Sequence, residues 1–212
     1  MLGLDQAAAL ASVAVSGRVV DVLVGAGKTT AMNALRRAWE TEHGAGAVVG
    51  LAPSAVVAQV LADDLGIQTE NTAKWWTTHQ HTGATFQARQ LVIIDEASLA
   101  GTLSLERITQ AAEEAGAKVL LVGDYAQLQS VDAGGAFSLL IHDRDDAPEL
   151  VDVHRFIHTW EKTASLELRH GRTPVIDTYL DHDRIHDGDA EAMTDAAYTA
   201  WRHDRRQGCC RC

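Results

Sequence analysis

The chain has 212 residues, a length that holds one full domain and the beginning of a second. A hydrophobic fraction of 46% supplies a substantial core, but no apolar run reaches the ~18 residues of a membrane span and no signal-peptide pattern is present, so we expect a cytoplasmic protein without membrane contact. The net charge of −11 excludes a general basic coat for nucleic acid, although a local groove lined with Lys or Arg remains compatible with it.

Apolar runs of strand length alternate with helical patterns, which predicts βαβ units around a parallel sheet. In chain order the predicted elements are helix 4–16, strand 18–24, helix 29–41, strand 47–52, helix 55–65, helix 71–79, strand 91–94, helix 103–115, strand 118–122 and helix 136–142. Ser54 is the expected N-cap of the helix 55–65, and residues 80–90 resemble a polar surface loop. We therefore expect an α/β domain over residues 1–148.

The character of the chain changes after residue 148. One short strand candidate, 151–156, is followed by helical patterns at 159–169, 173–180 and 190–205. Residues 149–205 are thus expected to be the mostly helical, incomplete beginning of a second domain. The last residues, 206–212, hold all three cysteines and show no packing pattern, so they resemble a non-native tail rather than a disulfide framework.

A strand leading into Gly-Lys-Thr is the first of two candidate phosphate-site fragments. The fragment comprises Gly25, Ala26, Gly27, Lys28, Thr29 and Thr30. Backbone N–H groups and the Lys28 ammonium suit β/γ-phosphates, and the Thr29 hydroxyl suits Mg²⁺, as in a Walker A element.

This loop is shorter than the Walker A pattern. The pattern has a glycine six residues before the lysine, where this chain has Val22, so the loop is roughly three residues short. Fraying of residues 22–24 would lengthen it, but positive φ is costly for valine. The N-terminus of the following helix is still present and can attract an anion. We therefore expect weak phosphate binding and impaired hydrolysis.

The second fragment is the run 91–94 followed by Asp95 and Glu96, a Walker B pattern. Asp95 would hold Mg²⁺ through its water shell, and Glu96 would polarise the attacking water. The alternative is a pair of acids capping a helix. Gln127 follows the strand 118–122 and would sense the γ-phosphate, whereas in isolation its Gly-Asp-x-x-Gln context is typical of a turn.

Further residues suit other parts of a nucleotide-driven DNA site. Gln6 lies at the distance upstream of the loop where helicases often place an adenine-reading glutamine, and Arg155 is a candidate arginine finger. Their alternatives are a surface helix residue and a surface ion pair. Candidates for single-stranded DNA contact are Pro53, Ser54, Thr72, Lys74 and Trp75. The tryptophan would equally suit the core.

The ordered motifs resemble the superfamily 1 (RecD-like) helicase region of MobF-type conjugative relaxases (TraI/TrwC-like), from about residue 4 to residue 205. The resemblance rests on segments 20–25, 50–54, 71–75, 92–98, 122–128, 134–137, 155–156 and 160–162. It implies a RecA-like P-loop NTPase, a three-layer α/β/α fold with a central parallel sheet. It also implies that Lys28, Thr29, Asp95, Glu96 and Gln127 serve ATP and Mg²⁺, Gln6 the adenine, and Arg155 the γ-phosphate.

Three departures from that family define the hypotheses. By that resemblance the phosphate loop is short, and we expect this chain to lack the relaxase domain and most of the second motor domain. We therefore expect no unwinding by this chain alone. The expected function is that of an ATP-hydrolysing helicase motor domain. The expected partners are a separately encoded relaxase, a separately encoded second helicase domain, and single-stranded DNA that binds weakly. Alternatives are a non-hydrolysing nucleotide- or DNA-binding remnant and an inactive pseudogene product. A P-loop kinase is disfavoured because no lid arginines are evident.

Overall fold

The computed structural model describes residues 3–25, 28–124, 135–144, 147–150 and 158–206. The chain divides into two compact units, Met1–Arg155 and Phe156–Cys212, and each is considered by itself. The first unit thus extends past residue 148, because the short strand after that residue pairs with the sheet.

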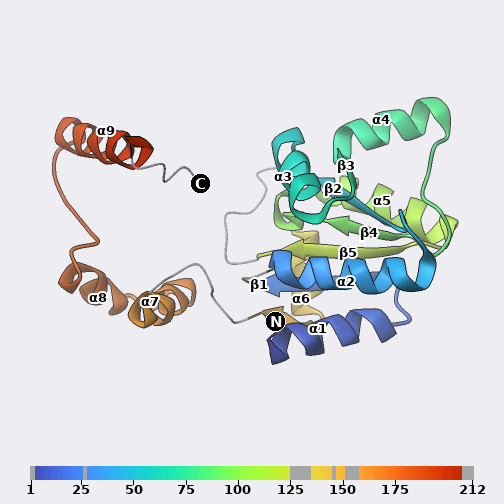
Figure 1. The fold of residues 1–212 in the computed structure, drawn as a ribbon, viewed down its shortest axis with the longest axis horizontal. Coiled ribbons are helices and arrows are strands. Elements are labelled where there is room, and N and C mark those ends of the chain that lie inside the picture. Colours follow the sequence, from blue (N-terminus) through green and yellow to red (C-terminus); the bar gives the residue numbers. More distant parts are fainter. Residues whose placement is uncertain (1–2, 26–27, 125–134, 145–146, 151–157, 207–212) are drawn as a thin grey trace. The chain divides into compact units, whose positions relative to one another are not determined.

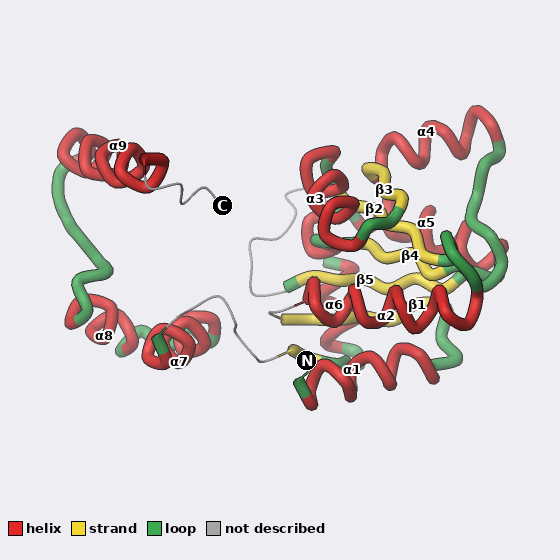
Figure 2. The backbone as a smooth tube through the Cα atoms, viewed as in Figure 1, coloured by secondary structure: helices red, strands yellow, loops and turns green. Residues whose placement is uncertain are grey.

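The first unit is built on a parallel sheet (Figures 1 and 2). Its described strands are β1 (Val20–Gly25), β2 (Val48–Ala52), β3 (Gln68–Asn71), β4 (Leu91–Ile94), β5 (Lys118–Gly123) and β6 (Glu149–Leu150). The spatial order is β3-β2-β4-β5-β1-β6, and every neighbouring pair is parallel. The predicted strands ending near residues 24, 94 and 122 therefore lie side by side as β1, β4 and β5.

Helices connect the strands and cover both faces of the sheet. The described helices of this unit are α1 (Leu4–Val15), α2 (Lys28–His43), α3 (Ala55–Leu65), α4 (Thr72–Thr82), the 3₁₀ turn η1 (Ala97–Leu99), α5 (Thr102–Ala115) and α6 (Ala136–His142). Helix α3 begins where predicted, because the Ser54 Oγ accepts a hydrogen bond from the Val57 N–H at 3.2 Å.

Two hydrophobic clusters, one on each face of the sheet, confirm the three-layer α/β/α fold. Val92 and Ile94 of β4 pack with α5 and α6, whereas Leu91 and Ile93 of the same strand pack with α1, α2 and α3. The same alternation holds in β5. Because side chains on both faces are buried, these strands are continuous apolar runs, which is why the sequence predicts them well.

Several boundaries differ from the sequence prediction. The helix predicted at 29–41 begins at Lys28 and ends at His43, and α4 extends to Thr82. In the predicted surface loop 80–90, Phe86 is buried in the core. Strand β3 was not predicted, because Gln68–Asn71 is a polar edge strand that pairs with β2 through its backbone. The strand candidate at 151–156 lies outside the described residues.

The second unit contains α7 (Thr159–Arg169), α8 (Val175–Asp181) and α9 (Ala190–Arg206). Helices α7 and α8 pack against each other around Ala164 and Val175, and the Trp160 ring stacks on His182 with centroids 3.7 Å apart. Among its described residues, α9 has none that is buried. Residues 207–212 of the predicted tail lie outside the described part of the chain. No helix in that described part is long and apolar enough to cross a membrane.

Candidate functional site

The two fragments identified in the sequence meet at the carboxyl edge of the sheet. Lys28 is the first described residue after β1 and opens α2, while Asp95 and Glu96 directly follow β4. Only β5 lies between those two strands. The Lys28 Nζ lies 4.0 Å from the Glu96 Oε1. A lysine and a carboxylate pair far apart in sequence are thereby brought into one site, as is usual for ligand sites of open α/β sheets.

The Lys28 ammonium is buried and has no hydrogen-bond partner within the described part of the chain. Its side chain is 14% exposed, and no described group accepts a hydrogen bond from the Nζ. The Glu96 Oε2 is likewise buried without a hydrogen-bond partner among the described residues. A separation of 4.0 Å attracts by charge but is too long for a hydrogen bond. Since an ammonium carries three donors and no described group accepts from Lys28, the ammonium suits an anionic ligand.

Glu96 adopts a backbone conformation that non-glycine residues rarely occupy. Its φ of 49° lies in the left-handed region, and its N–H donates to the Asp95 Oδ1 at 2.9 Å. It stands at the N-cap of η1, yet its side chain makes no capping hydrogen bond. The alternative in which Glu96 serves as a helix cap is therefore not supported. Strain of this kind concentrates at functional sites.

Burial raises the pKa of Asp95 above its usual range, and the nearby Lys28 charge opposes that rise. The folded chain therefore holds the Asp95 proton more tightly than the unfolded chain does. The stability contributed by this carboxyl is complete below the ordinary aspartate pKa, and it is lost as the pH rises through the raised pKa. An ionised Asp95 is therefore a cost to the stability of the folded chain, and a bound cation would offset that cost.

Asp95→Asn is therefore expected to increase the free energy of unfolding at neutral pH, because the amide is never charged. The difference from wild type should vanish as the pH falls below about 4. Urea unfolding from about pH 3.5 to pH 8 measures it. Asp143→Asn, at an exposed carboxyl, is the matched control. Parallel pH profiles for wild type and Asp95→Asn would contradict the assignment.

The segment predicted as a short phosphate loop is not lengthened by fraying of β1. Val22–Val24 remain paired with β5 and are 1% exposed, and Gly25 pairs with Leu150 of β6. Gly25 has a φ of 106°, and a Cβ there would lie 2.1 Å from the Leu150 O, so the close approach of β6 requires glycine. Ala26 and Gly27, the residues between β1 and α2, lie outside the described part of the chain.

The remaining predicted nucleotide residues fall into three places. Thr29 and Thr30 occupy the exposed first turn of α2. Gln6 lies in the first turn of α1, only 2% exposed, and its Oε1 accepts the Gly3 N–H at 3.0 Å, so it is not the surface residue of the alternative. Gln127 and Arg155 lie outside the described residues.

Several of the predicted DNA-contact residues make contacts within the protein that the sequence does not suggest. Ser54 caps α3, beside Pro53, and Thr72 is buried. Lys74 is 67% exposed and pairs with Glu70. Pairing with Lys74 also lowers the pKa of the Glu70 carboxyl.

Trp75 is covered on its faces by the protein itself. Its ring stacks on Phe86 at 4.7 Å and on His79 at 5.2 Å, and it packs against the core. The neighbouring Trp76 instead carries the Arg107 guanidinium 4.7 Å from its ring centroid. Sequence reasoning gave no role to Arg107, since nothing in the pattern of α5 places it beside α4.

Comparison with known proteins gives matches over most of the chain. The family model described as AAA domain matches residues 1–190. The conjugal transfer protein TraA of Rhizobium radiobacter is 35% identical over 211 residues, 96% of this chain and 18% of its own length. TraA of Agrobacterium fabrum is 34% identical over 170 residues, 79% of this chain and 15% of its own length. The chain thus spans under a fifth of these relatives.

Solved structures support the fold. The Pif1 helicase of Candida albicans superposes with a TM-score of 0.56 at 16% identity, over 80% of this chain and 44% of that structure. The large terminase of a thermophilic bacteriophage gives 0.50 at 12% identity, over 71% and 45%. These two matches show the fold, and the TraA relatives show that the chain is similar to a part of conjugal transfer proteins. By the match over residues 1–190, the chain belongs to the AAA domain family.

Proposed function

We propose that the first unit is the ATP-binding, ATP-hydrolysing motor domain of a conjugative relaxase-helicase. The observation that carries the proposal is the Lys28 ammonium at the start of a 16-residue helix, beside two consecutive carboxylates. It is buried and has no hydrogen-bond partner among the residues that the structure describes. A helix N-terminus and a lysine together attract phosphate oxygens. Burial raises the pKa of Asp95 although Lys28 and the Glu96 N–H favour its ionised form, and a bound cation would favour that form further.

The donor set fits Mg²⁺. The Thr29 hydroxyl and Asp95 would hold the ion, which when bound screens phosphate charge and polarises the phosphoryl oxygens. Glu96 would accept a proton from the attacking water. Gln6 would read the adenine, Gly25, Ala26, Gly27 and Thr30 would complete the phosphate loop, and Gln127 and Arg155 would act on the γ-phosphate.

The proposed macromolecular partner is single-stranded DNA. Pro53, Ser54, Thr72 and Lys74 remain candidates because they cluster where β2 and β3 end, at the same edge as Lys28. Because its ring already stacks on Phe86 and His79, Trp75 would pack beneath this surface and would not stack on DNA bases. Helices α7–α9 would begin the second motor domain, and a relaxase domain and the rest of that motor would be further partners.

A second candidate function is nucleotide binding without turnover. This candidate is favoured because β1 stays paired with β6 as far as Gly25 and α2 is already helical at Lys28. Few backbone N–H groups then remain to wrap β- and γ-phosphates. In that case the site would hold phosphate at the α2 N-terminus but would not align a γ-phosphate with the water beside Glu96.

Titration with a fluorescent ATP analogue in Mg²⁺ tests the proposed function. Lys28→Ala should weaken binding at least tenfold, because a charged hydrogen bond contributes about 1.5–3 kcal/mol and ~1.4 kcal/mol is a factor of ten. Lys74→Ala removes the same charge at an exposed position and should leave the affinity within about twofold. Equal affinities for wild type and Lys28→Ala would refute this site. Binding without phosphate release would favour the second candidate.

A further inference from the structure

Helix α9 of the second unit exposes an apolar face. This helix (red in Figure 1) is 17 residues long, and none of its side chains is buried. It nevertheless begins at a defined residue, because the Asp189 Oδ1 accepts a hydrogen bond from the Ala192 N–H at 2.8 Å. A helix of this length gains most of its stability from the packing of an apolar face. We therefore expect that a partner covers the face of α9.

The apolar face of α9 lies beside a line of three larger polar and aromatic side chains. The residues of the apolar face recur at helical spacing and are Ala190, Met193, Ala197, Ala200 and Trp201. Along one flank of this face lie Glu191, Tyr198 and Arg205, each seven positions from the next. Because two turns of α-helix take about 7.2 residues, these three side chains leave the helix in nearly the same direction. We call them the flank line.

Two exposed aromatic rings of α9 are held in place by arginines. Tyr198 and Trp201 stack with their ring centroids 5.8 Å apart, although they are 56% and 50% exposed. The Arg202 guanidinium lies 5.7 Å from the Tyr198 ring centroid, and that of Arg205 lies 5.0 Å from the Trp201 centroid. Tryptophan, tyrosine and arginine are the residues that contribute most to protein–protein binding. Rings that are already ordered lose little entropy when a partner covers them.

The charges of α9 are separated along its length. Glu191 and Asp195 lie in its first two turns, and its three arginines all lie in its last two. With Asp204, the three acidic residues balance the three arginines, so the helix has no formal net charge. It therefore has no excess of positive charge for a phosphate backbone or an anionic membrane. A partner helix with the reverse order of charges would complement it, and an antiparallel second copy of α9 has that order.

We infer that α9 is a dimerisation helix, which pairs antiparallel with α9 of a second copy of this chain about a two-fold axis at Tyr198. Tyr198 lies eight positions from either end of α9, and Glu191 and Arg205 each lie seven positions from Tyr198. When the two helices overlap along their whole length, Glu191 therefore lies opposite the partner's Arg205. The two-fold symmetry repeats this contact, so the flank lines form two ion pairs around the paired tyrosines.

Large side chains face small ones in this arrangement. Trp201 lies three positions beyond Tyr198, so it is opposite position 195 of the second copy and packs over the small side chains at positions 194 and 197. Each helix is about 25 Å long, and such a contact is smaller than the ~1,600 Å² of a standard interface. We therefore expect a weak dimer with a micromolar dissociation constant. The pairing needs no nucleotide, and its test is independent of the proposed ATP site.

Sedimentation equilibrium of the full chain tests the pairing. Glu191→Arg places two arginines opposite each other at both contacts, and Arg205→Glu does the same with two glutamates. Each variant alone should dimerise at least about tenfold more weakly than wild type, because like charges then face each other twice. An equimolar mixture of the two variants should regain most of the wild-type affinity, since both contacts are then between arginine and glutamate. Glu106→Arg, the same reversal at an exposed position of α5, is the matched control and should leave dimerisation unchanged.

Recovery in the mixture separates pairing from misfolding. Two variants in which α9 had merely unfolded would not associate when mixed. A wild type that stays monomeric at millimolar concentration overturns the inference, as do single variants that dimerise like wild type and a mixture that stays monomeric. A monomeric wild type that binds a single-stranded oligonucleotide, with binding lost in Trp201→Ala, would assign the face of α9 to nucleic acid instead.

Discussion

Glu96→Gln is expected to lower the rate of ATP hydrolysis by about 10²–10⁴-fold, the usual contribution of a general base. Binding of ATP should be retained or tightened slightly. The reason is the 4.0 Å separation of the Lys28 Nζ and the Glu96 Oε1, because the carboxylate would compete with a phosphate for the same ammonium. Glutamine keeps the shape of the side chain and removes that competition. Steady-state phosphate release and equilibrium titration together measure the two effects.

Glu106→Gln is the matched control for this variant, because it makes the same chemical change at an exposed position on α5. Its hydrolysis rate should equal that of wild type. Thermal unfolding of both variants should also be compared, since Glu96 occupies a left-handed backbone position that glutamine tolerates no better. Hydrolysis by Glu96→Gln at the wild-type rate would remove Glu96 from the reaction and return it to a structural role.

The central sheet could be predicted because strands that are buried on both faces are continuous apolar runs in the sequence. Val92 and Ile94 face one helical layer and Leu91 and Ile93 the other, so β4 reads as an unbroken apolar run. The N-cap at Ser54 was equally visible, since a hydroxyl before an apolar helix has few other roles. Lys28 and Asp95 could be joined because parallel strands end at one edge.

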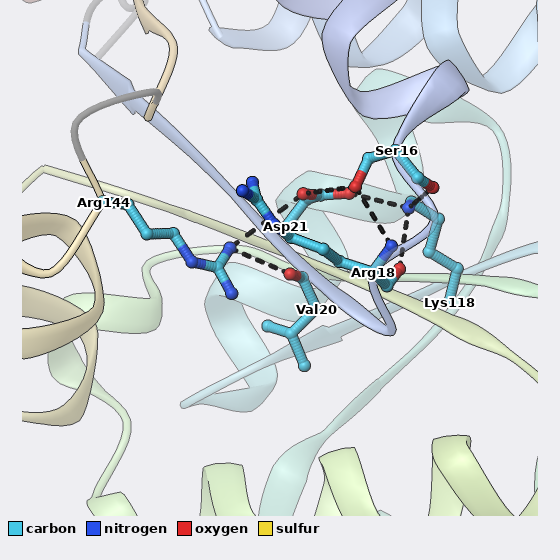
Figure 3. Close-up of polar contacts among 6 residues, drawn as sticks. All are labelled: Ser16, Arg18, Val20, Asp21, Lys118 and Arg144. Carbon is cyan, nitrogen blue, oxygen red and sulfur yellow. Dashed lines mark hydrogen bonds and ion pairs between the residues drawn. The ribbon is translucent and has the colours of Figure 1, made fainter.

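Other features had no local signal. Strand β3 is held by backbone pairing to β2, and its Gln-Thr-Glu-Asn sequence resembles a loop. Trp75 looked suited to stack on DNA, but Phe86, buried from within the predicted loop, takes one face of its ring. The buried ion pair of Asp21 and Lys118 (Figure 3) joins residues 97 positions apart (118 − 21), and only the β1–β5 pairing brings them together. Contacts that depend on tertiary register are those that a single sequence does not reveal.

The proposed ATP hydrolysis is expected to depend most on the length of the predicted phosphate loop. Strand β1 stays paired through Gly25, where β6 packs so closely that a Cβ would meet the Leu150 O at 2.1 Å. Helix α2 is already formed at Lys28. Strand and helix are thus both fixed at their ends, and neither unwinds to supply the missing chain. Three further residues would add up to ~10 Å of backbone, about the span of a phosphate cradle.

Insertion of Pro-Ala-Gly after Gly25 is therefore expected to tighten ATP·Mg²⁺ binding by about a hundredfold. The added backbone N–H groups would donate hydrogen bonds to charged phosphate oxygens, and each contact contributes about 1.5–3 kcal/mol before the cost of ordering the loop. Two such contacts with a net contribution of ~1.4 kcal/mol each correspond to a hundredfold change in affinity. Lys28→Ala in the inserted chain should abolish the gain, because the new N–H groups and the ammonium bind the same phosphates. Titration of a fluorescent ATP analogue against the native chain, the inserted chain and each Lys28→Ala counterpart measures all four affinities.

An insertion of equal length after Gly44 controls for the added chain length. Gly44 lies in an exposed turn, and no atom lies within 4 Å of an added Cβ there. Micromolar binding by the native chain that the insertion leaves unchanged would mean that the short loop is competent and that the α2 N-terminus with Lys28 suffices.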